Sequence, residues 1–108
     1  MRGDHARLQD MLDAIAAIRR HTQGGRTTYD RDELVRVWVL HHLQIIGEAA
    51  ARLDPAGTAA RTLPTASIVG MRNVLVHGYF QIDDELVWKV VEKELDSLEE
   101  QLRALLSP

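Results

Sequence analysis

The chain has 108 residues, of which 45% are hydrophobic and 27% are charged, and it contains no cysteine. This size and composition predict one globular domain over residues 1–108, and they exclude disulfide bonds and thiolate metal sites. The net charge of -3, from 13 basic and 16 acidic residues, argues against a protein that coats nucleic acid through a broad basic surface. Any contact with nucleic acid must therefore be local.

The N-terminal half predicts two helices. The first covers residues 4–21, because its apolar side chains recur at three- and four-residue spacing, and the glycines at 24–25 end it. Thr28 or Asp30 can cap the second, which covers residues 32–53 and is apolar on most sides. Polar side chains interrupt this second helix, so it is predicted to be buried in protein and not to span a membrane. The absence of cysteine and of an N-terminal signal pattern favours the cytoplasm.

The C-terminal half predicts a loop over residues 54–64 and two more helices. Thr65 or Ser67 can cap the third helix, which is short and ends near Gly78, and Asp83 caps the fourth, which runs to about residue 106. No strand pattern is present. The sequence therefore predicts an all-α fold, an antiparallel up-and-down four-helix bundle with one short helix. The long helices are apolar on more than one face, so a monomer would expose apolar surface that a homodimer would cover.

The segment "RNVLVHGY", residues 72–79, combines a polar trio with an apolar run. On an ideal helix each residue advances by ~100°, so Asn73 and His77 share a face while Arg72 and His77 diverge by about 140°. One straight helix cannot aim both at a single phosphate. Either the helix loosens at His77 and Gly78, or a two-fold dimer brings Arg72 of one protomer beside His77 of the other.

Arginine beside histidine suits the cleavage of a phosphodiester. Arginine is a fixed planar cation that binds phosphate oxygens in pairs, and histidine can accept and donate a proton near neutral pH. In RNA the 2′-hydroxyl adjoins the scissile phosphate, so a base and a cation can cut the strand without a metal. The acids at 83–85 are explained by helix capping, and no metal or other cofactor is expected.

The longer segment "GMRNVLVHGYFQID" resembles the signature of the HepT-like branch of the HEPN superfamily. Its motif is arginine, four residues, histidine, one residue, tyrosine, and Arg72, His77 and Tyr79 fill those places. The "IIGEAA" segment at 45–50 resembles the second-helix signature of the family, and "VW" at 87–88 resembles its last-helix pattern. The similarity extends over most of the chain and implies a HEPN-like helical bundle.

The resemblance implies a homodimeric, metal-independent endoribonuclease that acts as the toxin of a toxin–antitoxin pair. Its substrate would be RNA, with tRNA as one candidate. Arg72 and His77 would be catalytic and Asn73 a polar helper. It further implies a partner, a minimal nucleotidyltransferase (MNT-type) antitoxin that silences the enzyme by AMPylation of Tyr79. Ala66 and Ser67 stand where many relatives have a tryptophan, which predicts different packing of the loop before the active helix.

Other conspicuous residues have structural explanations. Glu48 lies within the apolar second helix and needs a partner, which could be a structural ion pair with an arginine of another helix or a contact that holds Arg72. His41 and His42 are adjacent and point about 100° apart, so they are assigned to packing or to the surface. Trp38 and Trp88 are predicted to anchor the core or a dimer interface.

Two other functions compete with the ribonuclease. One is a catalytically silent helical dimer whose Arg72 and His77 bind a nucleotide or a partner enzyme. The other is a purely structural helical dimer, because a histidine at a helix end is often a cap and an arginine nearby is often a solvated charge.

Overall fold

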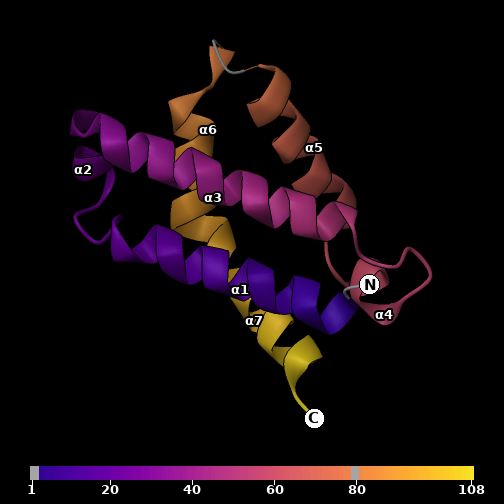
Figure 1. The fold of residues 1–108 in the computed structure, drawn as a ribbon. Helices are drawn as coiled ribbons and strands as arrows, with labels where there is room; N and C mark the ends of the chain where they lie inside the picture. Colours follow the sequence, from indigo (N-terminus) through magenta and orange to yellow (C-terminus); the bar gives the residue numbers. More distant parts are fainter. Residues whose placement is uncertain (1–2, 79–80) are drawn as a thin grey trace.

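All regular secondary structure in the described residues is helical, which confirms the prediction of an all-α fold. The computed structural model describes residues 3–78 and 81–108. Three long helices come first along the chain and a C-terminal helical segment follows: α1 (Asp4–Arg20), α3 (Glu33–Ala51), α5 (Thr65–His77), then α6 (Asp84–Lys89), η2 (Val90–Glu94) and α7 (Leu95–Leu106). Two short helices, α2 (Arg26–Arg31) and α4 (Thr58–Thr62), lie in the connections (Figure 1).

Helices α1 and α3 lie side by side and run antiparallel (Figure 1). At one end the backbone N–H of Asp54, just beyond α3, donates to Oδ1 of Asp4 at 3.0 Å. Towards the other end Nε1 of Trp38 donates to the carbonyl oxygen of Ala17 at 2.7 Å. The start of each helix is thus tied to the end of the other, and the pair forms the frame on which the remaining helices pack.

The C-terminal segment crosses behind α3 and α1 in the view of Figure 1. Near the end of α1, Arg19 forms ion pairs with Asp96 and Glu99 of α7. The hydrogen bond from Arg19, reinforced by one from Arg103, holds the pKa of the Glu99 carboxyl below its usual value. This cluster fixes the crossing point of α1 and α7 from the outside of the core.

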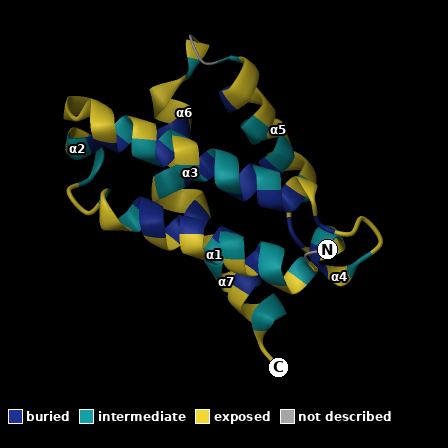
Figure 2. Cartoon of the chain, viewed as in Figure 1, coloured by how far each residue is buried: buried dark blue, intermediate teal, exposed yellow. Residues whose placement is uncertain are grey.

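The core lies where these helices face one another, as the dark blue segments of Figure 2 show. Each aliphatic side chain buried there stabilises the fold by about 1.5–3 kcal/mol relative to an exposed position. The largest side chains that are fully buried come from α1, α2, α3 and α7, and they are Met11, Ile15, Ile18, Tyr29, Val39, Leu43, Ile46, Leu95 and Leu102. Helix α5 contributes Ile68 and Leu75.

Several large apolar side chains remain in solvent, as the sequence predicts for a single protomer. Leu34 is 79% exposed and Val37 51% exposed at the start of α3, and Val74 and Val76 of α5 are 56% and 46% exposed. Leu86 of α6 is 55% exposed. Water contact with such side chains is unfavourable, so they mark surface that association would cover.

The structure corrects two predicted helix caps. Asp32 caps α3, its side chain accepting from the backbone N–H of Leu34, while Thr28 and Asp30 lie within the short helix α2. The turn between the first two long helices is itself helical, so the cap falls after it. Helix α5 begins at Thr65 without a side-chain cap, because the Thr65 hydroxyl donates back to the carbonyl oxygen of Ala60 instead.

Two further segments differ from the prediction. The stretch 54–64, predicted as a loop, contains the single-turn helix α4. The final helix begins after Asp83 as predicted, with the Asp83 side chain accepting from the N–H groups of Glu85 and Leu86, but a π-helical turn interrupts its α-helical pattern at η2. Within residues 3–78 and 81–108, each helix is too short or too polar to cross a membrane.

Candidate active site

Helix α5 carries the polar motif and stays regular to its end. The backbone N–H of Gly78 still donates to the carbonyl oxygen of Val74 at 2.7 Å, so the helical pattern extends past His77. Gly78 permits this tight end, since a Cβ there would lie 2.9 Å from the same oxygen. The loosening of the helix that could have turned His77 towards Arg72 is therefore not observed. At helical spacing the two side chains diverge by about 140° around α5.

Arg72 is turned towards α3, where it meets Glu48. Its Nη1 lies 2.5 Å from Oε1 of Glu48, and the two side chains are 22% and 46% exposed respectively. Nε of Arg72 is buried and has no hydrogen-bond partner among the described residues. A guanidinium carries five N–H donors, so the contact with Glu48 orients the group and leaves donors for a phosphate.

Gly47 explains why α5 can approach α3 so closely at this point. A Cβ built on Gly47 would lie 2.2 Å from Cβ and 2.6 Å from Cγ of Arg72, far inside van der Waals contact. Any larger residue would push Arg72 away from the helix that holds it. The "IIGEAA" segment thus has two separate functions here: Gly47 admits the arginine side chain and Glu48 binds its guanidinium.

The two interpretations of Glu48 coincide in the structure. The carboxylate does pair with an arginine of another helix, and that arginine is Arg72. The Glu48 side chain is also more exposed than its position in an apolar stretch of sequence predicted. The contact is therefore accessible to solvent and to a ligand, although it still fixes one edge of the guanidinium.

His77 and Asn73 are exposed on α5. They lie four residues apart and so share a face of the helix, as predicted. His77 forms no hydrogen bond or ion pair with another residue in the described part of the chain, which leaves both imidazole nitrogens open to a substrate. Tyr79, the predicted modification site, lies outside the described residues.

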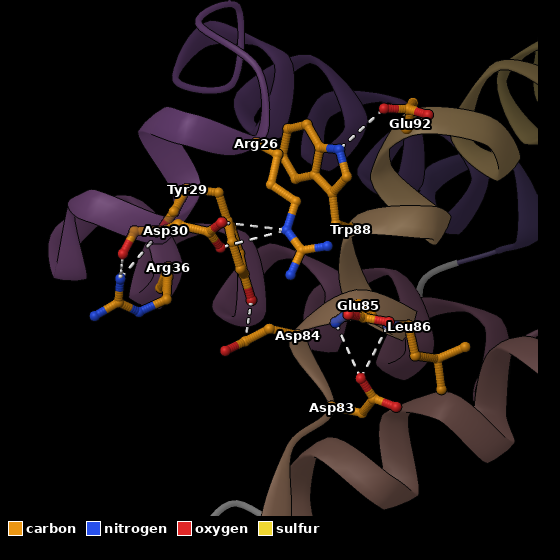
Figure 3. A network of polar contacts seen from close by, with 10 residues as sticks. All are labelled: Arg26, Tyr29, Asp30, Arg36, Asp83, Asp84, Glu85, Leu86, Trp88 and Glu92. Atoms are coloured by element: carbon orange, nitrogen blue, oxygen red, sulfur yellow. Dashed lines mark hydrogen bonds and ion pairs between the residues drawn. The ribbon is translucent and has the colours of Figure 1, made fainter.

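A polar network ties the start of α6 to α2 and α3 (Figure 3). The Tyr29 hydroxyl of α2 donates to Oδ1 of Asp84 at 2.7 Å, in the first turn of α6. Nη1 of Arg36 donates to the carbonyl oxygens of Tyr29 and Asp30, which holds α2 against α3. Burial, reinforced by the bond to Asp84, raises the pKa of the Tyr29 hydroxyl well above its usual value.

The sequence did not identify Tyr29 as part of this arrangement, because its neighbours Thr28 and Asp30 were considered only as caps of the second helix. Asp83 binds backbone N–H groups, as the capping interpretation predicted, whereas Asp84 binds the Tyr29 hydroxyl, a contact that capping did not predict. Across residues 3–78 and 81–108, no three His, Asp or Glu side chains gather in a group that could hold a metal ion.

Residues 11–105 match the family model described as "Ribonuclease HepT-like". The chain belongs to the HepT-like ribonuclease family. The matched range contains the Gly47–Glu48 pair and the complete Arg72 to Tyr79 motif, and the predicted family is confirmed. A comparison with solved structures found no significant match.

Relatives of the HepT-like chain carry ribonuclease names. A protein of Methanocaldococcus jannaschii named "Putative RNase MJ1380" is 32% identical over 72 residues, 66% of either chain. A protein of Caldanaerobacter subterraneus subsp. tengcongensis named "Putative RNase TTE0752" is 35% identical over 74 residues, 68% of this chain and 65% of the relative. A protein of Thermococcus cleftensis named "Probable ribonuclease HepT" is 29% identical over 108 residues, 91% of either chain. The chain thus spans about two thirds of the length of the first two relatives.

Proposed function

We propose that this HepT-like chain is a metal-independent endoribonuclease whose catalytic residues are Arg72 and His77. The family match and the names of the relatives support the reaction class. The geometry of α5 supports the choice of these two residues. Arg72 is a partly exposed cation held in one orientation by Glu48, and His77 is an exposed imidazole whose nitrogens are available to a substrate.

One observation carries the further proposal that the site is composite. Arg72 is fixed against α3 while His77 leaves a regular helix in another direction, so one protomer offers a phosphate only half of the catalytic pair. A two-fold homodimer would supply the other half from its partner. The exposed valines Val74 and Val76 lie on the same helix as the motif and would be covered by such an interface.

In this mechanism the His77 imidazole of one protomer takes the proton of the RNA 2′-hydroxyl. The resulting oxygen attacks the adjacent phosphorus, and the Arg72 guanidinium of the other protomer stabilises the negative charge that develops on the phosphate oxygens. The bond to the 5′-oxygen breaks and that oxygen takes a proton from water, and the hydroxide so formed takes the proton from the His77 imidazolium. The products are a 2′,3′-cyclic phosphate and a 5′-hydroxyl end. Asn73, one turn before His77, would orient the imidazole or the phosphate.

We further propose that the enzyme is a toxin of the cytoplasm, acting on tRNA or another RNA, and that an MNT-type nucleotidyltransferase antitoxin silences it by AMPylation of Tyr79. Tyr79 follows His77 by two residues in the chain. An adenylyl group there would bring a negative phosphate and a purine next to the catalytic histidine, where they would compete with RNA. Intact mass after co-expression with the cognate nucleotidyltransferase tests this part, and a Tyr79→Phe variant is its control.

Mixed dimers give the sharpest test of the composite site. Arg72→Ala and His77→Ala chains should each be inactive on RNA in the presence of a chelator. Co-expressed as a mixed dimer, they should regain activity, because one of the two sites then combines an intact Arg72 with an intact His77. Random association predicts roughly a quarter of the wild-type rate. No recovery would show that both residues act within one protomer.

The silent-dimer alternative predicts a different result. A chain that only binds nucleotides or a partner enzyme would bind RNA or AMP in calorimetry while wild type and His77→Ala leave RNA equally intact. The ion pair with Glu48 is the observation in its favour, since it already neutralises part of the charge of Arg72. Measurable cleavage by wild type that His77→Ala abolishes would exclude this alternative.

A further inference from the structure

A polar groove between α1 and α3 adjoins the Glu48–Arg72 pair. It contains a pocket of about 250 Å³ whose polar lining includes Arg7 and Asp10 of α1, His41 and Glu48 of α3, and Arg52 just beyond α3. Glu48 is therefore shared, since it lines this pocket and also holds the proposed catalytic arginine. A ligand that occupies the pocket would reach the edge of the proposed active site.

The pocket offers two cations that an anion could contact, beside two carboxylates. Arg7 and Arg52 bring two permanent cations from facing helices, and Nε of Arg7 is buried without a hydrogen-bond partner among the described residues. A buried donor of this kind is costly unless a ligand or water satisfies it. Two acids also line the pocket, but the charge of Glu48 is already opposed by Arg72.

A row of aromatic contacts continues from the pocket towards the other end of the groove. The ring of His41 meets that of His42 at 5.1 Å, and the His42 ring meets Trp38 at 4.3 Å. Trp38 in turn contacts His21 at 4.9 Å, and the Arg20 guanidinium lies 5.9 Å from its ring. None of these rings belongs to the buried core.

The spacing of these residues along α3 and α1 places them on the sides of the two helices that face each other. On α3, Trp38, His41 and Glu48 share one side of the helix, and Trp38 lies about 15 Å from Glu48 along its axis. On α1, Arg7 and His21 lie at opposite ends of the facing side. Figure 1 shows the two helices side by side over this length. Two cations, Arg7 and Arg52, thus lie at the pocket, and the rings of His41, Trp38 and His21 follow along the same pair of helices.

We propose that this α1–α3 groove binds single-stranded RNA beside the proposed active site. Arg7 and Arg52 contact phosphates, and the rings of His41, Trp38 and His21 contact unstacked bases. The inference rests on the proposed ribonuclease function for its choice of ligand. Base stacking on aromatic rings together with phosphate contacts from arginine is the usual basis of single-strand binding. A groove built for a protein helix would be lined mainly by apolar side chains, whereas this pocket has mostly polar ones.

Binding of a fluorescently labelled oligouridylate to the full-length His77→Ala chain tests the groove without cleavage. Adding Arg7→Gln and Arg52→Gln should weaken binding by roughly tenfold. It should also lower the slope of log K against log salt by about 1.4, or 0.7 for each phosphate that an arginine no longer neutralises. The matched control carries Lys89→Gln and Lys93→Gln in the same background. These side chains are exposed on α6 and η2, so the control changes net charge equally outside the groove.

A second pair of variants tests the rings. His21→Ala and His41→Ala remove exposed side chains that the core does not need, so neither should unfold the protein. Each should weaken RNA binding by roughly fivefold and change the salt slope less than the arginine pair does, because ring stacking releases no counterions.

The outcomes separate this inference from the proposed function. The groove is not the RNA site if the Arg7 and Arg52 variant binds with the affinity and salt slope of its control, or if the His77→Ala chain binds no RNA at all. If wild type cleaves no RNA while the groove variants still bind RNA more weakly, the catalytic proposal fails and the groove stands. If wild type cleaves RNA and the groove variants bind RNA as tightly as their control, the catalytic proposal stands and the groove proposal fails.

Discussion

Nη1 of Arg72 in α5 lies 2.5 Å from Oε1 of Glu48 in α3, directly beside the glycine that lets the two helices meet. An arginine side chain has four rotatable bonds and would otherwise sample many directions from a helix surface. The carboxylate selects one of them. Because both side chains are partly exposed, the pair contributes little to stability, and its main effect is to orient a cation.

Glu48→Gln should therefore reduce catalysis much more than stability. A misplacement of about 1 Å in a catalytic group can cost roughly a hundredfold in rate, so we expect kcat on RNA to fall by about tenfold to a hundredfold while KM changes little. The free energy of unfolding should change by less than about 1 kcal/mol. Initial rates and urea denaturation measure the two effects.

Glu33→Gln is the matched control for this change, because Glu33 is exposed in the first turn of the same helix. Glu48→Asp, which keeps the charge on a shorter side chain, should recover part of the rate. A kcat for Glu48→Gln equal to that of the control would mean that Glu48 does not position Arg72.

Gly47→Ala should destabilise the protein, whereas Gly70→Ala should not. A Cβ at position 47 would collide with the Arg72 side chain at 2.2 Å, while a Cβ at position 70 meets nothing within 4 Å. Overpacking of this kind costs about 1–3 kcal/mol. In the open helical position, alanine should add roughly 0.5–1 kcal/mol, because it restricts the unfolded chain. Urea midpoints at one protein concentration compare the two, and equal shifts would contradict the close approach of α5 and α3.

Tyr29→Phe should change how the free energy of unfolding depends on pH, because it removes a buried hydroxyl. Loss of the bond to Asp84 should lower the free energy of unfolding by about 1 kcal/mol at neutral pH. Because the pKa of Tyr29 is raised in the folded state, its stabilising contribution is fully present below the ordinary value of 10.0. As the pH rises above that value the unfolded chain ionises and the folded chain does not, so the contribution is lost.

Urea denaturation of wild type and Tyr29→Phe between neutral pH and about pH 11 measures this difference. The two curves of stability against pH should converge above pH 10.0, with wild type falling more steeply. Parallel curves over that range would show that the hydroxyl ionises as readily in the folded chain as in the unfolded one.

The sequence predicted the helices whose apolar periodicity and end signals agree. Asp83 and Gly78 fall at the predicted ends because an aspartate cap and a terminal glycine act locally, through bonds to backbone atoms a few residues away. The caps proposed at Thr28 or Asp30 and at Thr65 or Ser67 were wrong because these residues lie inside helical turns that begin earlier than propensity indicates. The π-helical turn η2 likewise continues the same apolar stripe and leaves no mark in the sequence.

The candidate site could be predicted only in part. The motif named Arg72, Asn73 and His77, but spacing along one helix says nothing about a contact across two helices. The partner of Glu48 was left open between structural and functional alternatives for this reason. Gly47 was noticed only as part of a signature, and its physical function required the position of the Arg72 side chain.

Glu99→Gln should weaken the crossing of α1 and α7 at neutral pH and have no effect in acid. The Glu99 carboxylate pairs with Arg19 of α1 and with Arg103 one turn away, and these bonds keep its pKa below the ordinary value of 4.5. A group with a lowered pKa in the folded state stabilises the protein above its unfolded pKa, and that contribution is lost as the pH falls through the folded pKa. The variant should therefore be less stable than wild type by about 1 kcal/mol at neutral pH, with the difference shrinking below pH 4.5.

Glu100→Gln is the control, since Glu100 is the exposed neighbour and pairs with no cation in the described part of the chain. Thermal unfolding at fixed protein concentration across this pH range decides the matter, and a Glu99→Gln deficit that persists in acid would show that packing, and not the ion pairs, accounts for it.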